Sequence, residues 1–237
     1  MTPEPPDVLD TATQHVTVGV DQGCDHLTQQ VVRFAPGRSR QRGFEGERVE
    51  EVLYVQDGRG TLELGSNVYP LHPDTAVHIA PGESYSIHNA GPEDLVLVAV
   101  AVPASRLETG ELGPRQVTMQ LSDQEVHATG NRRFRITTSP ASGCRSVTQF
   151  VGEIPPGAAP PHSHTYDEIV YVLSGEGICH VDGHSEPVAA GTAVYLPPKT
   201  VHCMENPGQD ILRVLGVFHP AGDPSSKTVQ PTERSAS

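Results

Sequence analysis

Two stretches of this chain decide its fold: residues 49–82, VEEVLYVQDGRGTLELGSNVYPLHPDTAVHIAPG, and residues 166–199, YDEIVYVLSGEGICHVDGHSEPVAAGTAVYLPPK. They align without a gap at an offset of 117 residues. The identical pairs include Glu51 and Glu168, Tyr54 and Tyr171, Gly58 and Gly175, Pro70 and Pro187, and Thr75 and Thr192. Self-similarity at a fixed offset indicates repeated structural units, so we predict two copies of one domain.

The pattern within each copy predicts short strands. Runs rich in Val, Tyr and Ile are separated by the turn sequences SGEG, DGH and AAGT. Such runs are typical of antiparallel hairpins, and their even spacing favours a closed barrel or jelly roll. A plain β-sandwich without a pocket fits the strands equally well, so the function must be inferred from the polar residues. We predict an all-β protein made of two tandem jelly-roll barrels.

Changes in composition mark the limits of the two domains. The stretch PASRLETGELGPRQ, residues 103–116, is polar and rich in turn formers, which is typical of a linker. The last residues, AGDPSSKTVQPTERSAS, have too little hydrophobicity to form a core. We expect a first barrel at 11–105, a linker at 106–130, a second barrel at 131–220 and a disordered tail at 221–237.

Charge and cysteine content exclude several classes of partner. The net charge of -13, without a dense Lys/Arg stretch, argues against nucleic acid and anionic membranes. No apolar run approaches the roughly 18 residues that a transmembrane helix needs. The four cysteines form no CxxC pair, so reduced thiols are expected. We expect a cytoplasmic protein with a small-molecule substrate, no nucleic-acid partner and no membrane partner; a homodimer stays open.

A candidate metal site lies in PPGAAPPHSHTYDEIVYVLSG, residues 155–175. His162 and His164 are two residues apart and Glu168 is four residues further, so on an extended strand all three face one side. His202 can add a fourth ligand from a neighbouring strand. Three imidazoles and a carboxylate suit a divalent transition metal: Mn, Fe, Ni, Co, Cu or Zn. An ion with a structural role alone stays an alternative.

These residues carry a resemblance to the cupin superfamily. Its two motifs are matched in order by Gly157, His162, His164, Glu168 and Gly175, and then by Gly191, Pro197, His202 and Asn206. The resemblance implies two cupin barrels in tandem, a bicupin. It also implies that His162, His164, Glu168 and His202 are the metal ligands.

The first copy has lost the histidines of this site. The same offset places Glu45 at the position of His162, Glu47 at that of His164, and Tyr85 at that of His202. Without imidazole the affinity for a transition metal should collapse, so we expect a metal-free first barrel with a degenerate site. His78 and His88 are expected to be exposed or hydrogen-bonded.

The first copy also resembles a narrower group. Residues 41–58, QRGFEGERVEEVLYVQDG, are similar to the corresponding stretch of the (S)-ureidoglycine aminohydrolase bicupins. The family's ligands are Glu, His, His and Gln, whereas this chain has three histidines and Glu168. Three functions stay open: a metal-dependent enzyme with dioxygenase, isomerase, lyase or hydrolase chemistry, which leads; an aminohydrolase-like hydrolase; and a non-catalytic barrel that binds metal and a small ligand.

Strand alternation suggests further residues of the cavity. Cys179 shares one strand face with Val181, and it is our choice for an inward side chain. Tyr195 and Met204 are further candidates, although side chains of these types often serve only barrel packing. No general base stands out, and a metal-bound water could fill that role.

Overall fold

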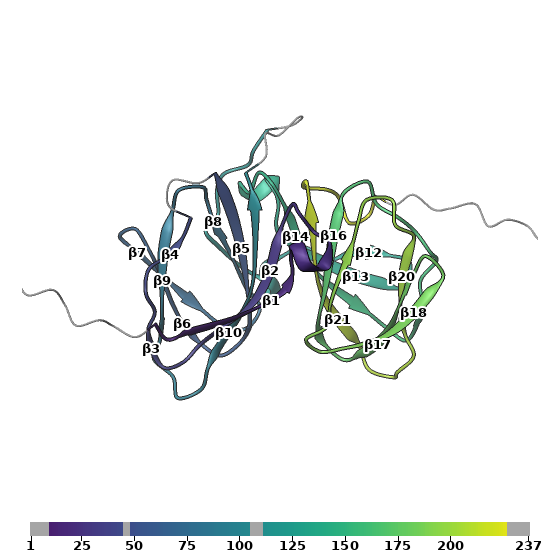
Figure 1. Ribbon diagram of the computed structural model, residues 1–237, viewed down its shortest axis with the longest axis horizontal. Helices are drawn as coiled ribbons and strands as arrows, with labels where there is room; N and C mark the ends of the chain where they lie inside the picture. Colours follow the sequence, from purple (N-terminus) through teal and green to yellow (C-terminus); the bar gives the residue numbers. More distant parts are fainter. Residues whose placement is uncertain (1–9, 45–47, 105–110, 227–237) are drawn as a thin grey trace, which may run out of the picture. The chain divides into compact units, whose positions relative to one another are not determined.

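The described residues of the computed structural model are 10–44, 48–104 and 111–226. Most of its regular elements are strands, and the helices in these ranges are three short 3-10 turns at Val20–Gln22, Leu121–Asp123 and Pro140–Ser142 (Figure 1). None of these turns has the length or the apolarity that a membrane crossing requires. The all-β prediction is confirmed.

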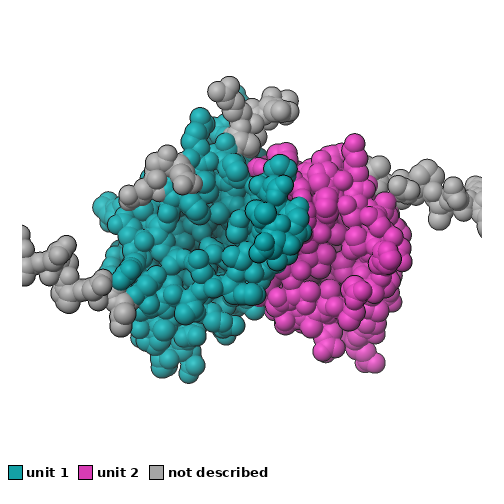
Figure 2. Space-filling view, viewed as in Figure 1, with its two compact units in different colours: residues 1–124, 138–146 teal, residues 125–137, 147–237 magenta. Residues whose placement is uncertain are grey.

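The chain divides into two compact units, which Figure 2 shows in two colours. The first unit contains residues 1–124 and 138–146, and the second contains residues 125–137 and 147–237. Each unit holds one copy of the sequence repeat, so each is described by itself.

The first unit folds as two antiparallel sheets. Its strands in the described part of the chain are β1 (Ala12–Val18), β2 (Thr28–Phe34), β3 (Gly37–Arg38), β4 (Arg42–Gly43), β5 (Val49–Asp57), β6 (Gly60–Leu64), β7 (Asn67–Leu71), β8 (Thr75–Ile79), β9 (Ser84–Asn89), β10 (Leu95–Pro103) and β11 (Thr118–Gln120). One sheet has the order β1-β2-β10-β5-β8-β11, and the other has the order β3-β9-β6-β7 with β4 also paired to β9.

The second unit repeats this arrangement. Its strands in the described part are β12 (His127–Thr129), β13 (Arg132–Thr138), β14 (Thr148–Ile154), β15 (Gly157–Ala158), β16 (Asp167–Ser174), β17 (Glu176–Val181), β18 (His184–Ala189), β19 (Ala193–Leu196), β20 (His202–Asn206) and β21 (Leu212–His219). The sheet orders are β12-β13-β14-β21-β16-β19 and β15-β20-β17-β18.

Alternation of side chains along the strands builds the two cores. On β9, Tyr85, Ile87 and Asn89 are buried, whereas the intervening residues are only half-buried. The buried positions join one apolar cluster in the first unit, which includes Leu53, Leu62 and Leu97. In the second unit an aliphatic cluster is complemented by three aromatic residues, Phe134, Phe150 and Phe218.

The turn between β17 and β18 shows how local sequence sets the pairing register. Asp182 and Gly183 both have positive φ, 46° and 84°. Two consecutive residues with positive φ suit the two-residue hairpin turn that matches strand twist, and Asp-Gly is a favoured pair there. The pairing of Val181 with His184 follows directly from this turn.

The segments expected to be irregular contain structure at several points. Within 106–130, residues 105–110 lie outside the described part, but β11 pairs with β8 and β12 pairs with β13. Of the expected tail, residues 227–237 lie outside the described part. Residues 221–226 are described, and they reach the candidate site.

Candidate functional site

The four residues that the sequence singles out as metal ligands come together inside the second unit. His162 and His202 face each other across an isolated antiparallel bridge, with backbone N–H to carbonyl distances of 3.0 and 2.8 Å. Glu168 lies near the start of β16 and His202 begins β20. His164 is held beside them because its carbonyl accepts the backbone N–H of Lys199 at 2.6 Å.

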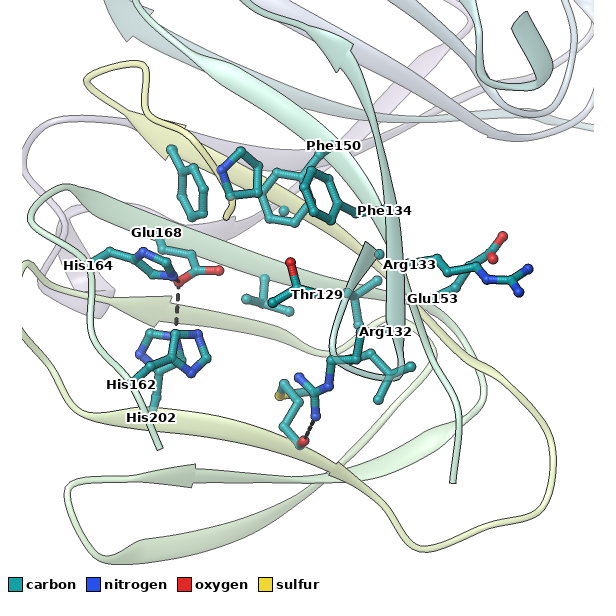
Figure 3. A pocket seen from close by; sticks show the side chains of 18 residues that line it. Thr129, Arg132, Arg133, Phe134, Phe150, Glu153, His162, His164, Glu168 and His202 are labelled. Carbon is teal, nitrogen blue, oxygen red and sulfur yellow. Dashed lines mark hydrogen bonds and ion pairs between the residues drawn. The ribbon is translucent and has the colours of Figure 1, made fainter. Parts of the chain in front are cut away.

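The donor atoms of these side chains form a tight group. The three imidazoles of His162, His164 and His202 bring ligand atoms within 4.8 Å of one another. Oε2 of Glu168 lies 3.1 Å from Nε2 of His202 and 3.7 Å from Nε2 of His164. Figure 3 shows the three rings and the carboxylate on one side of a cavity.

Each imidazole uses its Nδ1 for a contact with a backbone carbonyl. The partners are the carbonyls of Pro160 for His162 at 3.2 Å, Thr200 for His202 at 3.0 Å and Ser226 for His164 at 2.9 Å. Because a carbonyl only accepts, Nδ1 must carry the proton in all three rings. A neutral ring in this tautomer presents the lone pair of Nε2, and this is how second-shell contacts orient metal ligands.

Burial makes these groups depend on a cation. The three histidines and Glu168 are 5–7% exposed, and Oε2 of Glu168 is a buried oxygen without a hydrogen-bond partner among the described residues. The 3.1 Å contact between this oxygen and Nε2 of His202 therefore brings together two atoms that both carry lone pairs. Neither atom can donate a hydrogen bond to the other. A buried carboxylate in this position is costly unless a positive charge is paired with it. One divalent ion fits the donor set, and three nitrogen donors with one oxygen favour a transition metal.

The site opens into a small cavity of about 90 Å³. Aromatic side chains form much of its wall, including Phe134, Phe150 and Phe218. Arg132 also lines it and donates a hydrogen bond to the carbonyl of Met204 (Figure 3). Sequence reasoning missed these residues because they lie on β13, β14 and β21, outside the metal motifs. Their alternation along those strands is the signal that could have found them.

The start of the C-terminal tail covers part of the site. Tyr166 stacks on His164 with ring centroids 5.1 Å apart, and its hydroxyl donates to the carbonyl of Asp223 at 2.7 Å. Burial, with the nearby charges of Glu168 and Asp223, raises the pKa of Tyr166, so its hydroxyl stays protonated. Residues 223–226 thus contact His164 and Tyr166, which could not be predicted from the sequence.

The three tentative cavity residues have different places. Met204 lines the cavity. Cys179 instead packs in the aliphatic cluster, and burial, with Cys203 and Glu168 nearby, raises the pKa of its thiol to about 11. Tyr195 lies on the opposite face of β19 from the buried Leu196, and its hydroxyl donates to Asp167 at 2.6 Å. Of the three, Met204 lines the cavity, Cys179 faces the barrel interior without lining the cavity, and Tyr195 lies on the other face of β19 from the core residue Leu196.

The corresponding positions in the first unit are only partly described. Glu45 and Glu47 lie outside the described residues, whereas Glu51 and Tyr85 are buried, 4% and 3% exposed. Tyr85 hydrogen-bonds to Glu51 and to Arg42.

His78 is hydrogen-bonded in the first unit, as the sequence suggested. Its Nε2 lies 3.0 Å from Oε1 of Glu50, and Cys144 is close enough for the three residues to form a second potential donor group. However, the carboxylate of Glu50 also accepts the backbone N–H groups of Arg145 and Ser146, at 2.9 and 2.8 Å. We interpret this group as a structural network.

Comparison with known proteins supports a fold of two related barrels. The family model described as "Cupin domain" matches residues 30–101 and 150–218, more than half of the chain. The chain is 24% identical over 160 residues to (S)-ureidoglycine aminohydrolase of Escherichia coli, covering 66% of this chain and 60% of that protein. It is 36% identical over 68 residues to an oxalate-binding protein of Thermotoga maritima, covering 28% of this chain and 56% of that one. The chain thus spans little more than half the length of these curated relatives.

Solved structures show the same fold over nearly the whole chain. Protein Ylba from E. coli superposes with a TM-score of 0.74 at 16% identity, covering 91% of this chain and 88% of that one. An oxalate decarboxylase, OxdC of Bacillus subtilis, superposes with a TM-score of 0.73 at 17% identity, covering 91% and 75%. With two matched cupin domains, each on one barrel, the chain belongs to the cupin family and is a bicupin.

Proposed function

We propose that this bicupin is a metal-dependent enzyme acting on a small molecule, with one divalent transition metal held by His162, His164, Glu168 and His202. One observation carries the proposal. Three buried imidazoles present Nε2 toward a buried carboxylate oxygen, and every Nδ1 already has a carbonyl partner. This arrangement gathers three ring nitrogens and one carboxylate oxygen into a single donor group.

The chain's own residues divide the work at this site. The four ligand side chains hold the ion, and backbone carbonyls fix the ring orientations. Phe134, Phe150 and Phe218 exclude water from the cavity. When bound, a divalent ion supplies Lewis-acid chemistry and lowers the pKa of a coordinated water.

The cavity limits the substrate. A volume of about 90 Å³ accepts only a small molecule. Arg132 lines this cavity. Burial lowers the pKa of its guanidinium, but the ordinary pKa of this group is so far above neutral that Arg132 keeps its positive charge. Its guanidinium can orient an anionic or carbonyl group of the substrate while it keeps its bond to Met204. We therefore favour a compact substrate with an oxygen-rich end.

Two other functions have specific support. Similarity to (S)-ureidoglycine aminohydrolase over both barrels favours hydrolysis of a small ureide as the second candidate. Similarity of one segment to an oxalate-binding protein favours a barrel that binds metal and ligand without turnover.

One experiment separates these functions. The metal of the purified protein is quantified, and oxygen uptake and ammonia release are then measured with catechols, flavonols and small ureides. Oxygen uptake identifies a dioxygenase, ammonia release from a ureide identifies a hydrolase, and saturable binding without any chemical change of the ligand identifies a binder. Metal-stripped and reconstituted samples are the controls. Turnover that survives complete removal of metal contradicts the proposal.

A further inference from the structure

The first barrel contains a cavity that the metal site does not explain. Its volume is about 660 Å³, against about 90 Å³ for the cavity beside the candidate ligands in the second barrel. Its described lining includes Glu51 and Tyr85, which occupy the places of Glu168 and His202. The degenerate site is therefore an open space lined by polar groups.

Strand register explains why this cavity is larger. On the first barrel, Thr28 pairs with Ala101; on the second, Thr148 pairs with Phe218. Ala101 thus takes the place of Phe218 and removes one aromatic ring from the lumen. The next inward position follows the same register, so Gln30 takes the place of Phe150.

A third aromatic residue is replaced in the same way. Thr17 donates to the carbonyl of Gln29 just as Thr137 donates to the carbonyl of Gln149, so β1 and β13 are equivalent strands. Counting back three residues from each threonine makes Gln14 the equivalent of Phe134. The three rings that fill the second barrel are thus replaced by two carboxamides and a methyl group.

Gln14 is an exposed residue that lines this cavity, and Gln30 is half-buried. Gln14 accepts a hydrogen bond from Arg42 at 2.7 Å, and Arg42 also contacts Asp10 at 3.4 Å. Arg42 further lies over the ring of Phe34, 5.6 Å from its centroid. These contacts hold a guanidinium at the cavity, and its five N–H donors are well suited to a carboxylate.

Glu51 and Tyr85 form a hydrogen-bonded pair in this cavity, and Arg42 interacts with both. Burial raises the pKa of Glu51 to about 7, although Tyr85 and Arg42 partly oppose this. Burial and the charge of Glu51 raise the pKa of Tyr85, so its hydroxyl stays protonated and bonds to Glu51. Asp25 also lines the cavity, so the net charge of the lining does not attract an anion. The attraction must come from direct contact with Arg42.

We propose that this first-barrel cavity, lined by Arg42, Glu51, Tyr85, Gln14 and Gln30, is a metal-independent binding site for a small organic carboxylate. Arg42 pairs with the carboxylate, and the carboxamides of Gln14 and Gln30 bind the polar remainder of the molecule. The site is separate from the proposed metal centre and does not depend on its activity.

Calorimetric titration tests the proposal with acetate, succinate and benzoate, each compared with its neutral amide. The wild-type protein is expected to bind at least one of the acids and to bind its amide at least tenfold more weakly. Arg42→Gln should weaken acid binding at least tenfold. Gln30→Phe should abolish it, because it restores the ring found in the second barrel. His162→Ala/His164→Ala is the matched control, since carboxylates also bind metals, and it should retain full acid binding.

Each contrary result overturns the proposal. If the wild type binds none of the acids, the proposed site is refuted. If it binds an acid and its amide equally, recognition of the carboxylate is refuted. Binding that disappears in His162→Ala/His164→Ala but survives in Arg42→Gln assigns the acid to the metal centre. Melting curves verify that each variant folds. If Gln30→Phe does not fold, Arg42→Gln decides the outcome.

Discussion

At the scale of single residues, Glu168 offers the sharpest test of the metal site, because its Oε2 is buried without a hydrogen-bond partner among the described residues. Glu168→Gln keeps the size of the side chain and removes its charge. We expect the dissociation constant for Mn²⁺ or Zn²⁺ to rise at least tenfold, while the metal-free protein melts at the same or a higher temperature.

Titration of the metal-stripped protein by calorimetry measures this change. Glu186→Gln, on the exposed strand β18, is the control and should bind metal as the wild type does. Equal affinity in Glu168→Gln and the wild type would exclude Glu168 from the ligand set.

Glu50 gives a second prediction, on stability against pH. Burial alone would raise its pKa, but hydrogen bonds from His78, Ser146 and the backbone of Arg145 outweigh it and lower the pKa from 4.5 to about 2. The charged form is thus favoured by folding, and stability is full above pH 4.5 and lost as pH falls toward 2. At about 1.4 kcal/mol per pH unit the loss is on the order of 3 kcal/mol.

Urea denaturation of metal-stripped protein between pH 2 and about 7 tests this expectation. Glu50→Gln should be less stable than the wild type at neutral pH, and the difference should shrink toward zero as pH falls through the range from 4.5 to about 2. Glu186→Gln should follow the wild type at every pH. A constant gap between Glu50→Gln and the wild type down to pH 2 would contradict the assigned charge state.

The residues of the metal group could be predicted from sequence because their types and spacing are both restrictive. The cavity wall could not be predicted in the same way. Phe and Arg at strand positions serve packing as often as recognition, and their facing depends on register with distant strands. Tyr195 shows this limit, because its neighbour Leu196 fills the core position and turns the tyrosine away.

At the scale of elements, each barrel has a buried asparagine that holds the turn after β9 or β20. Nδ2 of Asn206 donates to the carbonyls of Ile154 and Asp210, at 2.8 and 2.7 Å, and its Oδ1 accepts from the N–H of Gly208 at 3.0 Å. Asn89 makes the equivalent three bonds with Phe34, Glu93 and Gly91. The turn that follows β9 and β20 is thus held by a side chain rather than by the backbone alone.

Replacing this side chain should destabilise either barrel. Asn206→Ala leaves two carbonyls and one N–H without their partner, so we expect a loss of about 2–4 kcal/mol in unfolding free energy. Asn89→Ala should cost a similar amount in the first barrel, and an exposed substitution such as Glu186→Ala should cost little. Urea denaturation measures all three, and a loss within experimental error for Asn206→Ala would contradict the assigned role.

Strands of the repeated segments were predicted from the sequence, but β1, β2, β13 and β14, which precede those segments in the two barrels, were not predicted individually. Elements outside the repeated core were missed. The three-residue strands β11 and β12 owe their existence to pairing with β8 and β13, so local sequence carries little of the signal. The same holds for residues 223–226, whose order comes from contacts with His164 and Tyr166.

At the scale of the whole molecule, duplication has given one fold two different interiors. The second barrel combines three histidines and a glutamate with aromatic walls and a small cavity. The first barrel has Glu51 and Tyr85 at the positions of Glu168 and His202, and its cavity is larger and lined by both polar and apolar groups. Under the two proposals, one chain would hold a metal in the second barrel and an organic acid in the first.

The central claim is that one transition metal binds per chain and that the second barrel holds it. The most direct measurement is the metal content, by mass spectrometry, of wild-type protein and of His162→Ala/His164→Ala purified in parallel. We predict about one equivalent per chain in the wild type, none in the double variant, and one in Glu51→Gln. A double variant that stays folded and keeps a full equivalent of metal would contradict the account.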